Sequence, residues 1–139
     1  MFVEFLNVWE TITMVVDVAE IVLTWRPFTK FLDAWAAFDG IPCVYVQTDK
    51  QKRPIRVGKA SMGLRKRYWG GTGYAMAAAM HDSGNFIFVA AVPETMCAEV
   101  EEELIWQLGE TLQYNIQGKA KRLPSHVELK HEGDSPAFG

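Results

Sequence analysis

The first 24 residues place apolar side chains at alternating steps of three and four. Seven positions carry this spacing: Phe2, Phe5, Trp9, Ile12, Val16, Ala19 and Leu23. Apolar residues spaced in this way share one face of a helix, so the pattern predicts a long amphipathic helix that ends before Pro27. The β-branched residues in Ile12–Val18 would also suit a strand. A second helix is predicted over residues 27–38, which makes residues 1–39 an N-terminal helical extension.

After Gly40 the pattern changes to the period of strands. Cys43–Thr48 and Pro54–Gly58 predict two short strands joined as a hairpin, and Asn85–Val92 predicts a third strand. Further helices are expected over Gly63–Trp69, Tyr74–Met80 and Glu94–Leu112. This order predicts an α+β fold, with a small three-stranded antiparallel sheet flanked by helices, over residues 40–124. A polar C-terminal tail, residues 125–139, is expected to be loose.

The composition narrows the class of protein. A chain of 139 residues that is 49% hydrophobic suits one folded domain and excludes wholesale disorder. Cys43 and Cys97 are too few for a disulfide framework or a cysteine-rich zinc site. The carboxylates among the first 24 residues argue against a signal peptide or a membrane span. We therefore expect a soluble cytoplasmic protein with no membrane partner.

Basic side chains gather in one stretch of the chain, although the net charge is −3. Eight of the 14 Lys and Arg residues lie there, with no acid between them: Lys50, Lys52, Arg53, Arg56, Lys59, Arg65, Lys66 and Arg67. A local basic surface attracts a polyanion even on an acidic protein. A solvated hairpin tip would have the same composition, so the charge pattern alone leaves both interpretations open.

One carboxylate of the predicted last helix falls on its apolar face. At about 100° per residue, Glu101 lies between Cys97 and Ile105. The other nearby glutamates, Glu99, Glu102 and Glu103, fall outside that apolar arc. A charge among apolar side chains is costly unless it is paired or binds a cation. Glu101 is therefore expected either to pair with an arginine or to hold a divalent ion in a cleft.

Two motifs in the predicted hairpin resemble the signature of the GIY-YIG nuclease family. Val44-Tyr45-Val46 is similar to the first half of that signature. Arg56-Val57-Gly58, followed by Lys59-Ala60, is similar to the second half. Arg56 stands where the family has its second signature tyrosine. An arginine there can bind a phosphate oxygen, but it cannot act as a phenol does.

Three further motifs follow in the order found in the family. Leu64-Arg65-Lys66-Arg67 resembles the motif in which a leucine precedes the catalytic arginine by three residues. Glu101 with Leu104-Ile105 resembles the metal-binding glutamate and its following pair, and Tyr114-Asn115 resembles the terminal asparagine motif. The resemblance covers residues 41–121 and includes the order of hairpin, arginine helix, third strand and glutamate helix.

The resemblance implies a metal-dependent endonuclease that hydrolyses phosphodiester bonds in DNA. Tyr45 would activate or position the water, Arg67 would bind the scissile phosphate, and Glu101 would hold Mg²⁺ or Mn²⁺. Arg56 is a further catalytic candidate, and Arg65 is the rival of Arg67 for its role. The expected DNA contacts are Lys52, Arg53, Lys59, Arg65, Lys66 and Asn115.

Two other functions stay open. One is a DNA-binding module that has lost cleavage, with Arg56 as the sign of that loss. The other is an interaction protein, because the apolar face of the N-terminal helix is wide enough to pack on its own domain or to form a homodimer.

Overall fold

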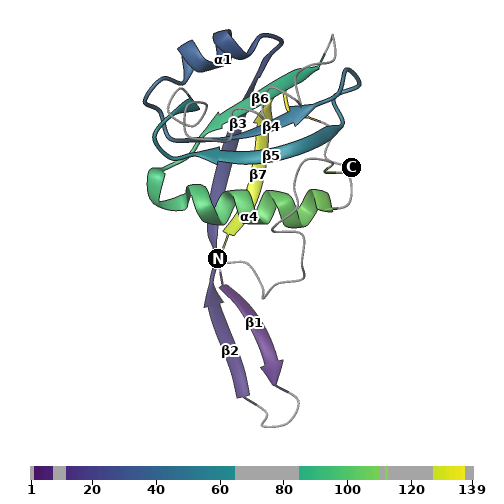
Figure 1. Ribbon diagram of the computed structural model, residues 1–139. Helices are drawn as coiled ribbons and strands as arrows, with labels where there is room; N and C mark the ends of the chain where they lie inside the picture. The colour runs from purple at the N-terminus through teal and green to yellow at the C-terminus, as the bar shows by residue number, and fades with distance from the viewer. Residues whose placement is uncertain (1, 8–11, 65–84, 110–111, 113–126, 137–139) are drawn as a thin grey trace.

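The computed structural model describes residues 2–7, 12–64, 85–109, 112 and 127–136. A hairpin of two antiparallel strands, β1 (Phe2–Asn7) and β2 (Ile12–Asp17), projects from the rest of the molecule (Figure 1). The other described strands form one sheet in the order β5-β4-β6-β3-β7. They are β3 (Ala19–Phe28), β4 (Cys43–Thr48), β5 (Pro54–Ala60), β6 (Phe86–Ala91) and β7 (Val127–Gly133).

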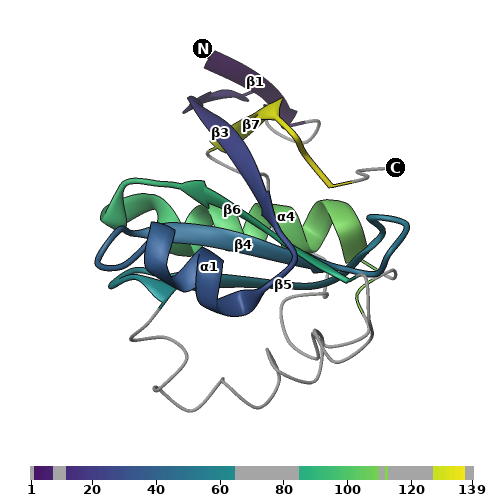
Figure 2. The same ribbon diagram turned by 90° about the horizontal axis from the view of Figure 1, so that it is seen from above.

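Helices lie on both sides of this sheet. Helix α1 (Phe31–Ala37) follows β3, and helix α4 (Cys97–Leu108) follows a short 3₁₀ turn over Glu94–Met96. In Figure 1, α1 lies above the sheet and α4 below it, and Figure 2 shows the same layers from above. Among the described residues, no helix is long and apolar enough to span a membrane.

The predicted N-terminal helical extension is wrong, because residues 2–7, 12–17 and 19–28 are strands. The β-branched residues of Ile12–Val18 favour an extended backbone, and this preference prevails over the helical spacing. Strand β3 buries Leu23 and Trp25, which are two residues apart and therefore on one face. The homodimer prediction depended on an N-terminal helix, which the structure replaces with strands.

The predicted three-stranded antiparallel sheet is also wrong, because the described sheet has five strands and is mixed. Strand β3 pairs antiparallel with β6 through its last residues. Its earlier residues pair parallel with β7, from Ala19 opposite Val127 to Trp25 opposite Gly133. Strand β7 thus forms within residues 125–139, where a loose tail was expected. The Trp25 indole nitrogen donates a hydrogen bond of 2.9 Å to His131 Nδ1 across this pairing.

The hairpin of β4 and β5 and the strand β6 are present where the sequence predicts them. β4 lies between β5 and β6 and is antiparallel to both. All six residues of β4 are buried. Since successive side chains of a strand point to opposite faces, β4 contributes to two separate cores.

Each face of the sheet has its own apolar core. On the α4 side, Val44, Val46 and Val57 pack in one cluster with the buried face of that helix: Cys97, Val100, Leu104, Ile105 and Leu108. On the α1 side, a second cluster contains Cys43 and Tyr45 of β4 together with the following residues: Ala34, Phe38, Ala60, Leu64, Ile87 and Val89. The alternation along β4 therefore directs the Tyr45 ring away from α4.

Candidate functional site

Tyr45 and Arg56 form a buried pair across the β4–β5 hairpin. The Tyr45 side chain is fully buried, and Arg56 is only 6% exposed. Arg56 Nη1 donates a hydrogen bond of 2.6 Å to Tyr45 Oη, and the guanidinium carbon lies 5.4 Å from the centre of the Tyr45 ring. The contact combines a charge-assisted hydrogen bond with a cation–π interaction. Two of the four predicted catalytic residues are thus in direct contact.

The register of the hairpin creates this contact. Tyr45 is opposite Gly58, and Gln47 is opposite Arg56, so Arg56 is the diagonal neighbour of Tyr45 on the same face. A Cβ at Gly58 would overlap Cζ and Oη of Tyr45 and would lie 2.7 Å from its Cε2. The phenol therefore extends directly over the Gly58 backbone toward Arg56. Only glycine leaves room for this arrangement.

The Arg56 guanidinium is buried with little to balance its charge. Its Nε is buried and has no hydrogen-bond partner, and no carboxylate among the described residues pairs with it. Tyr45 offers it a neutral oxygen instead. A buried cation without a counter-ion is costly, because it loses hydration without gaining an opposite charge. Chemically, this arrangement can receive an anion.

Gln47 is a buried polar residue that the sequence interpretation missed. It is fully buried on β4, two residues after Tyr45 and opposite Arg56. The alternation in Cys43–Thr48 was the signal that could have found it, because it places Gln47 on the face of Tyr45. The candidate site therefore has three buried polar side chains on one face of two strands.

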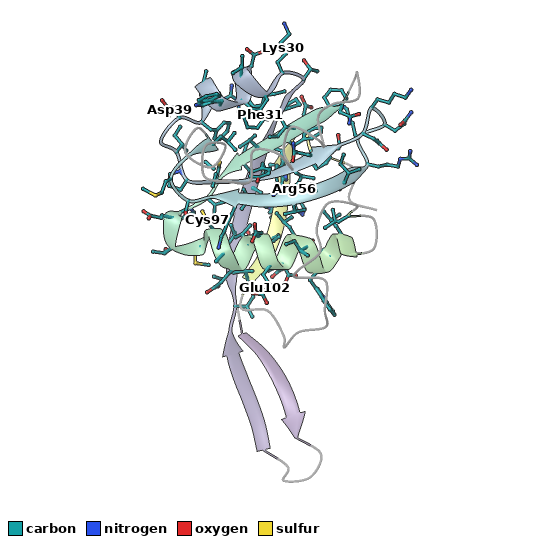
Figure 3. The ribbon with its side chains drawn as sticks, viewed as in Figure 1. Lys30, Phe31, Asp39, Arg56, Cys97 and Glu102 are labelled. Carbon is teal, nitrogen blue, oxygen red and sulfur yellow. The ribbon has the colours of Figure 1, made fainter. Side chains whose placement is uncertain are left out.

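Glu101 lies on the other side of the sheet. It belongs to α4, whose buried residues pack against Val44, Val46 and Val57 rather than against Tyr45. Figure 3 shows Arg56 within the sheet and helix α4, with Cys97 and Glu102 labelled, below it. Glu101 is half-buried, as the helical pattern predicts, but Glu103 is half-buried as well. Burial therefore does not distinguish Glu101 from every neighbouring glutamate.

Lys59 is on the same side as Glu101. Burial raises the pKa of the Cys97 thiol, the positive charge of Lys59 acts against this shift, and the negative charges of Glu94 and Glu101 add to it. Lys59 and Glu101 therefore lie close enough to Cys97 to share its electrostatic environment. This region brings a cation of β5 and a carboxylate of α4 to one face of the sheet.

The donor set around Glu101 limits the kind of ion that could bind. Within the part of the chain that the structure describes, no three His, Cys, Asp or Glu residues are grouped so that they could hold a metal ion. A single carboxylate fits Mg²⁺, which keeps several waters and takes phosphate oxygens as further ligands. Glu101 would hold such an ion, and the ion would supply charge neutralisation at a bound phosphate.

The predicted DNA contacts in the hairpin turn have surface partners. Arg53 Nε lies 2.9 Å from Asp49 Oδ2, in an exposed pair. Lys52 adopts a φ of 65°, and its ammonium lies 5.7 Å from the centre of the Phe86 ring. Exposed pairs of this kind contribute little to stability, so both cations can exchange these partners for a phosphate.

The remaining predicted site residues lie outside the described residues. They are Arg65, Lys66, Arg67 and Asn115. Their predicted roles therefore stay predictions.

Comparison of the chain with protein-family models, curated proteins and solved structures finds no match.

Proposed function

We propose that the protein is a metal-dependent endonuclease that hydrolyses DNA phosphodiester bonds. The observation that supports this most is the buried contact between Arg56 and Tyr45, because it joins two residues for which the resemblance to the GIY-YIG nuclease family implies phosphodiester chemistry. Arg56 has no carboxylate partner among the described residues, which suits a cation that meets a phosphate.

The reaction requires a nucleophile, charge stabilisation and a protonated leaving group. A water oxygen attacks phosphorus and loses a proton to solvent or a base, while the bond from phosphorus to the leaving oxygen breaks and that oxygen gains a proton. Glu101 would hold the divalent ion, which would supply charge neutralisation at the phosphate, and Arg67 would bind the scissile group. Tyr45 activates or positions the water, and Arg56 adds positive charge next to it. Because the buried Tyr45 ring lies on the opposite face of the sheet from α4, this role requires the hairpin to rearrange when DNA binds. Lys59 binds the DNA backbone.

A nicking assay tests this proposal. Supercoiled plasmid is incubated with the full chain in Mg²⁺, in Mn²⁺ and in EDTA, and the open-circular product is measured. We expect nicking only with a divalent ion, and at least a hundredfold slower nicking for Glu101→Ala. Glu102→Ala is the matched control, because Glu102 is the exposed neighbour on the same helix. Equal rates for the two variants, or no nicking with any ion, would contradict the proposal.

A DNA-binding module without cleavage is the second candidate. It is favoured by the complete burial of Tyr45 and by the position of α4 on the opposite face of the sheet from its ring. This candidate predicts that the protein retards DNA in a gel at low salt, that Lys59→Ala weakens the retardation, and that the DNA stays intact in every divalent ion. Nicking that depends on Glu101 would exclude it.

A further inference from the structure

The side chain of Arg56 has more hydrogen-bond donors than its surroundings use. It is more than nine-tenths buried, Nη1 donates to Tyr45 Oη, and the buried Nε has no partner. We infer that Arg56 is an oxyanion receptor whose Nε and Nη2 bind a phosphate group in a bidentate manner, without a metal ion. Tyr45 is its positioning residue. The inference rests on the proposed function only for its choice of phosphate as the anion.

The chemistry of guanidinium explains which edge is available. The group is planar, and its N–H bonds point outward in fixed directions. Nη1 lies on the side of Cδ, so a partner at Nη1 does not engage the N–H bonds along the edge formed by Nε and Nη2. Two parallel N–H bonds along one edge match two oxygens of a phosphate or a carboxylate. The hydrogen bond to Tyr45 therefore uses Nη1 and leaves the N–H groups of Nε and Nη2 for a ligand.

Burial gives the unused donor its significance. An exposed arginine would satisfy Nε with water, but Nε of Arg56 is inaccessible and unpartnered. Buried N–H donors in native proteins nearly always have a hydrogen-bond partner. A buried donor without one, such as Nε of Arg56, is therefore the kind of group that binds an anion. Arg53, four residues from Asp49 in the same hairpin, shows the ordinary alternative of a surface cation with its own carboxylate.

The surrounding charge favours phosphate over a carboxylate. The turn of the hairpin carries three cations, Lys50, Lys52 and Arg53, against one acid, Asp49, and Arg56 adds a further cation on the face of Tyr45. Inorganic phosphate or a terminal phosphate group carries up to two negative charges, whereas a phosphodiester carries one, and the attraction to a group of cations grows with that charge. A carboxylate carries one. The receptor is therefore matched to a phosphate.

Fixing the guanidinium is the role we assign to Tyr45. The ring cannot turn aside, because it is fully buried and lies against the Gly58 backbone. A side chain held in its binding orientation loses less conformational entropy when the ligand binds. Because Nε is covered, neighbouring side chains must shift before an anion reaches it. Binding is therefore expected to be coupled to a local opening.

Titration with inorganic phosphate tests the receptor directly. The full chain is kept in EDTA at constant ionic strength, with chloride replaced stepwise by phosphate, while the melting temperature and the arginine Nε–H resonances are recorded. We expect a saturable rise in melting temperature and a shift of one Nε–H resonance. Arg56→Met should remove both effects, and Arg56→Lys, which keeps the charge, should weaken the affinity at least tenfold. Arg26→Met, which removes an exposed arginine of β3 that lies outside this group of cations, should change neither.

The positioning role of Tyr45 has its own readout. Tyr45→Phe should weaken phosphate affinity severalfold and reduce the shift of the Arg56 Nε–H resonance, because the guanidinium is no longer fixed. Circular dichroism establishes that each variant is folded. The phosphate-induced shift of an arginine Nε–H resonance is measured in the unmodified protein, so this part of the test does not depend on any variant. Unchanged affinity and an unchanged resonance shift in Tyr45→Phe would overturn its role.

The remaining outcomes separate this inference from the proposed function. No saturable effect of phosphate beyond chloride, or binding by Arg56→Met as tight as that of the unmodified protein, overturns the receptor. An equal effect of acetate overturns the assignment to phosphate. Phosphate binding by a protein that nicks no DNA supports the receptor and contradicts the nuclease. Nicking by a protein that binds no phosphate in EDTA supports the nuclease and contradicts the receptor.

Discussion

The close approach of Tyr45 to Gly58 gives a prediction about stability. In Gly58→Ala the new methyl group overlaps Cζ and Oη of Tyr45. The ring is fully buried and has nowhere to move, so either the strands separate slightly or the phenol swings away from Arg56. Both responses disturb the β4–β5 hairpin, and the second leaves a buried guanidinium without its acceptor.

Three contributions set the size of the effect. Overpacking a core position costs about 1–3 kcal/mol. Losing the hydrogen bond from a charged group costs roughly 1.5–3 kcal/mol more. Alanine recovers about 0.5–1 kcal/mol, because glycine loses more backbone entropy in a strand. We expect Gly58→Ala to lower the free energy of unfolding by about 2–5 kcal/mol, a large part of the roughly 5–15 kcal/mol typical of a folded domain.

Urea unfolding followed by tryptophan fluorescence measures this loss. With a slope of about 1–3 kcal/mol per molar urea, the midpoint should fall by at least about 0.7 M. Gly40→Ala is the matched control, since its φ is 71° but no atom lies within 4 Å of the added Cβ. It should cost only the backbone strain of about 1–2 kcal/mol. In a Tyr45→Leu background the Gly58→Ala penalty should largely vanish. A wild-type midpoint for Gly58→Ala, or an undiminished penalty in that background, would refute the packing argument.

Three other changes have defined outcomes. Tyr45→Phe should lower the free energy of unfolding by about 1–3 kcal/mol in the same assay, because Arg56 Nη1 loses its acceptor; unchanged stability would contradict this. Burial lowers the pKa of His131 from its ordinary 6.5, so the unfolded chain takes up the proton first and stability falls as the pH drops below 6.5. His131→Gln should flatten that decline between about pH 7.5 and 5.5, and an equal decline in both proteins would argue against it. Deleting residues 127–133 should uncover β3 and cause aggregation on gel filtration, whereas a stable monomer would show that β7 is dispensable.

Local elements of the fold could be predicted because their signals are local. Cys43–Thr48 and the strand that follows it are joined by a short polar turn, so pattern and connection indicate the same hairpin. Helix α4 is amphipathic and begins shortly after Pro93. The pairing of β3 with β7 could not be predicted in this way, because Trp25 and His131 are 106 residues apart and neither segment indicates its partner.

The candidate site was predictable in part for the same reason. Tyr45 and Arg56 lie on adjacent strands of one hairpin, so their contact follows from a register that the turn sets. The position of Glu101 depends on which face of the sheet α4 covers. An amphipathic helix shows which of its own faces is buried, but it does not show which side of a doubly covered sheet receives it.

The parallel pairing of β3 with β7 also constrains how the molecule is made. While the chain is being synthesised, β3 emerges early and lacks this neighbour until residues 127–133 have left the ribosome. Closing so long a loop is slow compared with forming a hairpin. During that interval the backbone of β3 is a template to which a second nascent chain can attach, so efficient production should depend on translation speed and on chaperones.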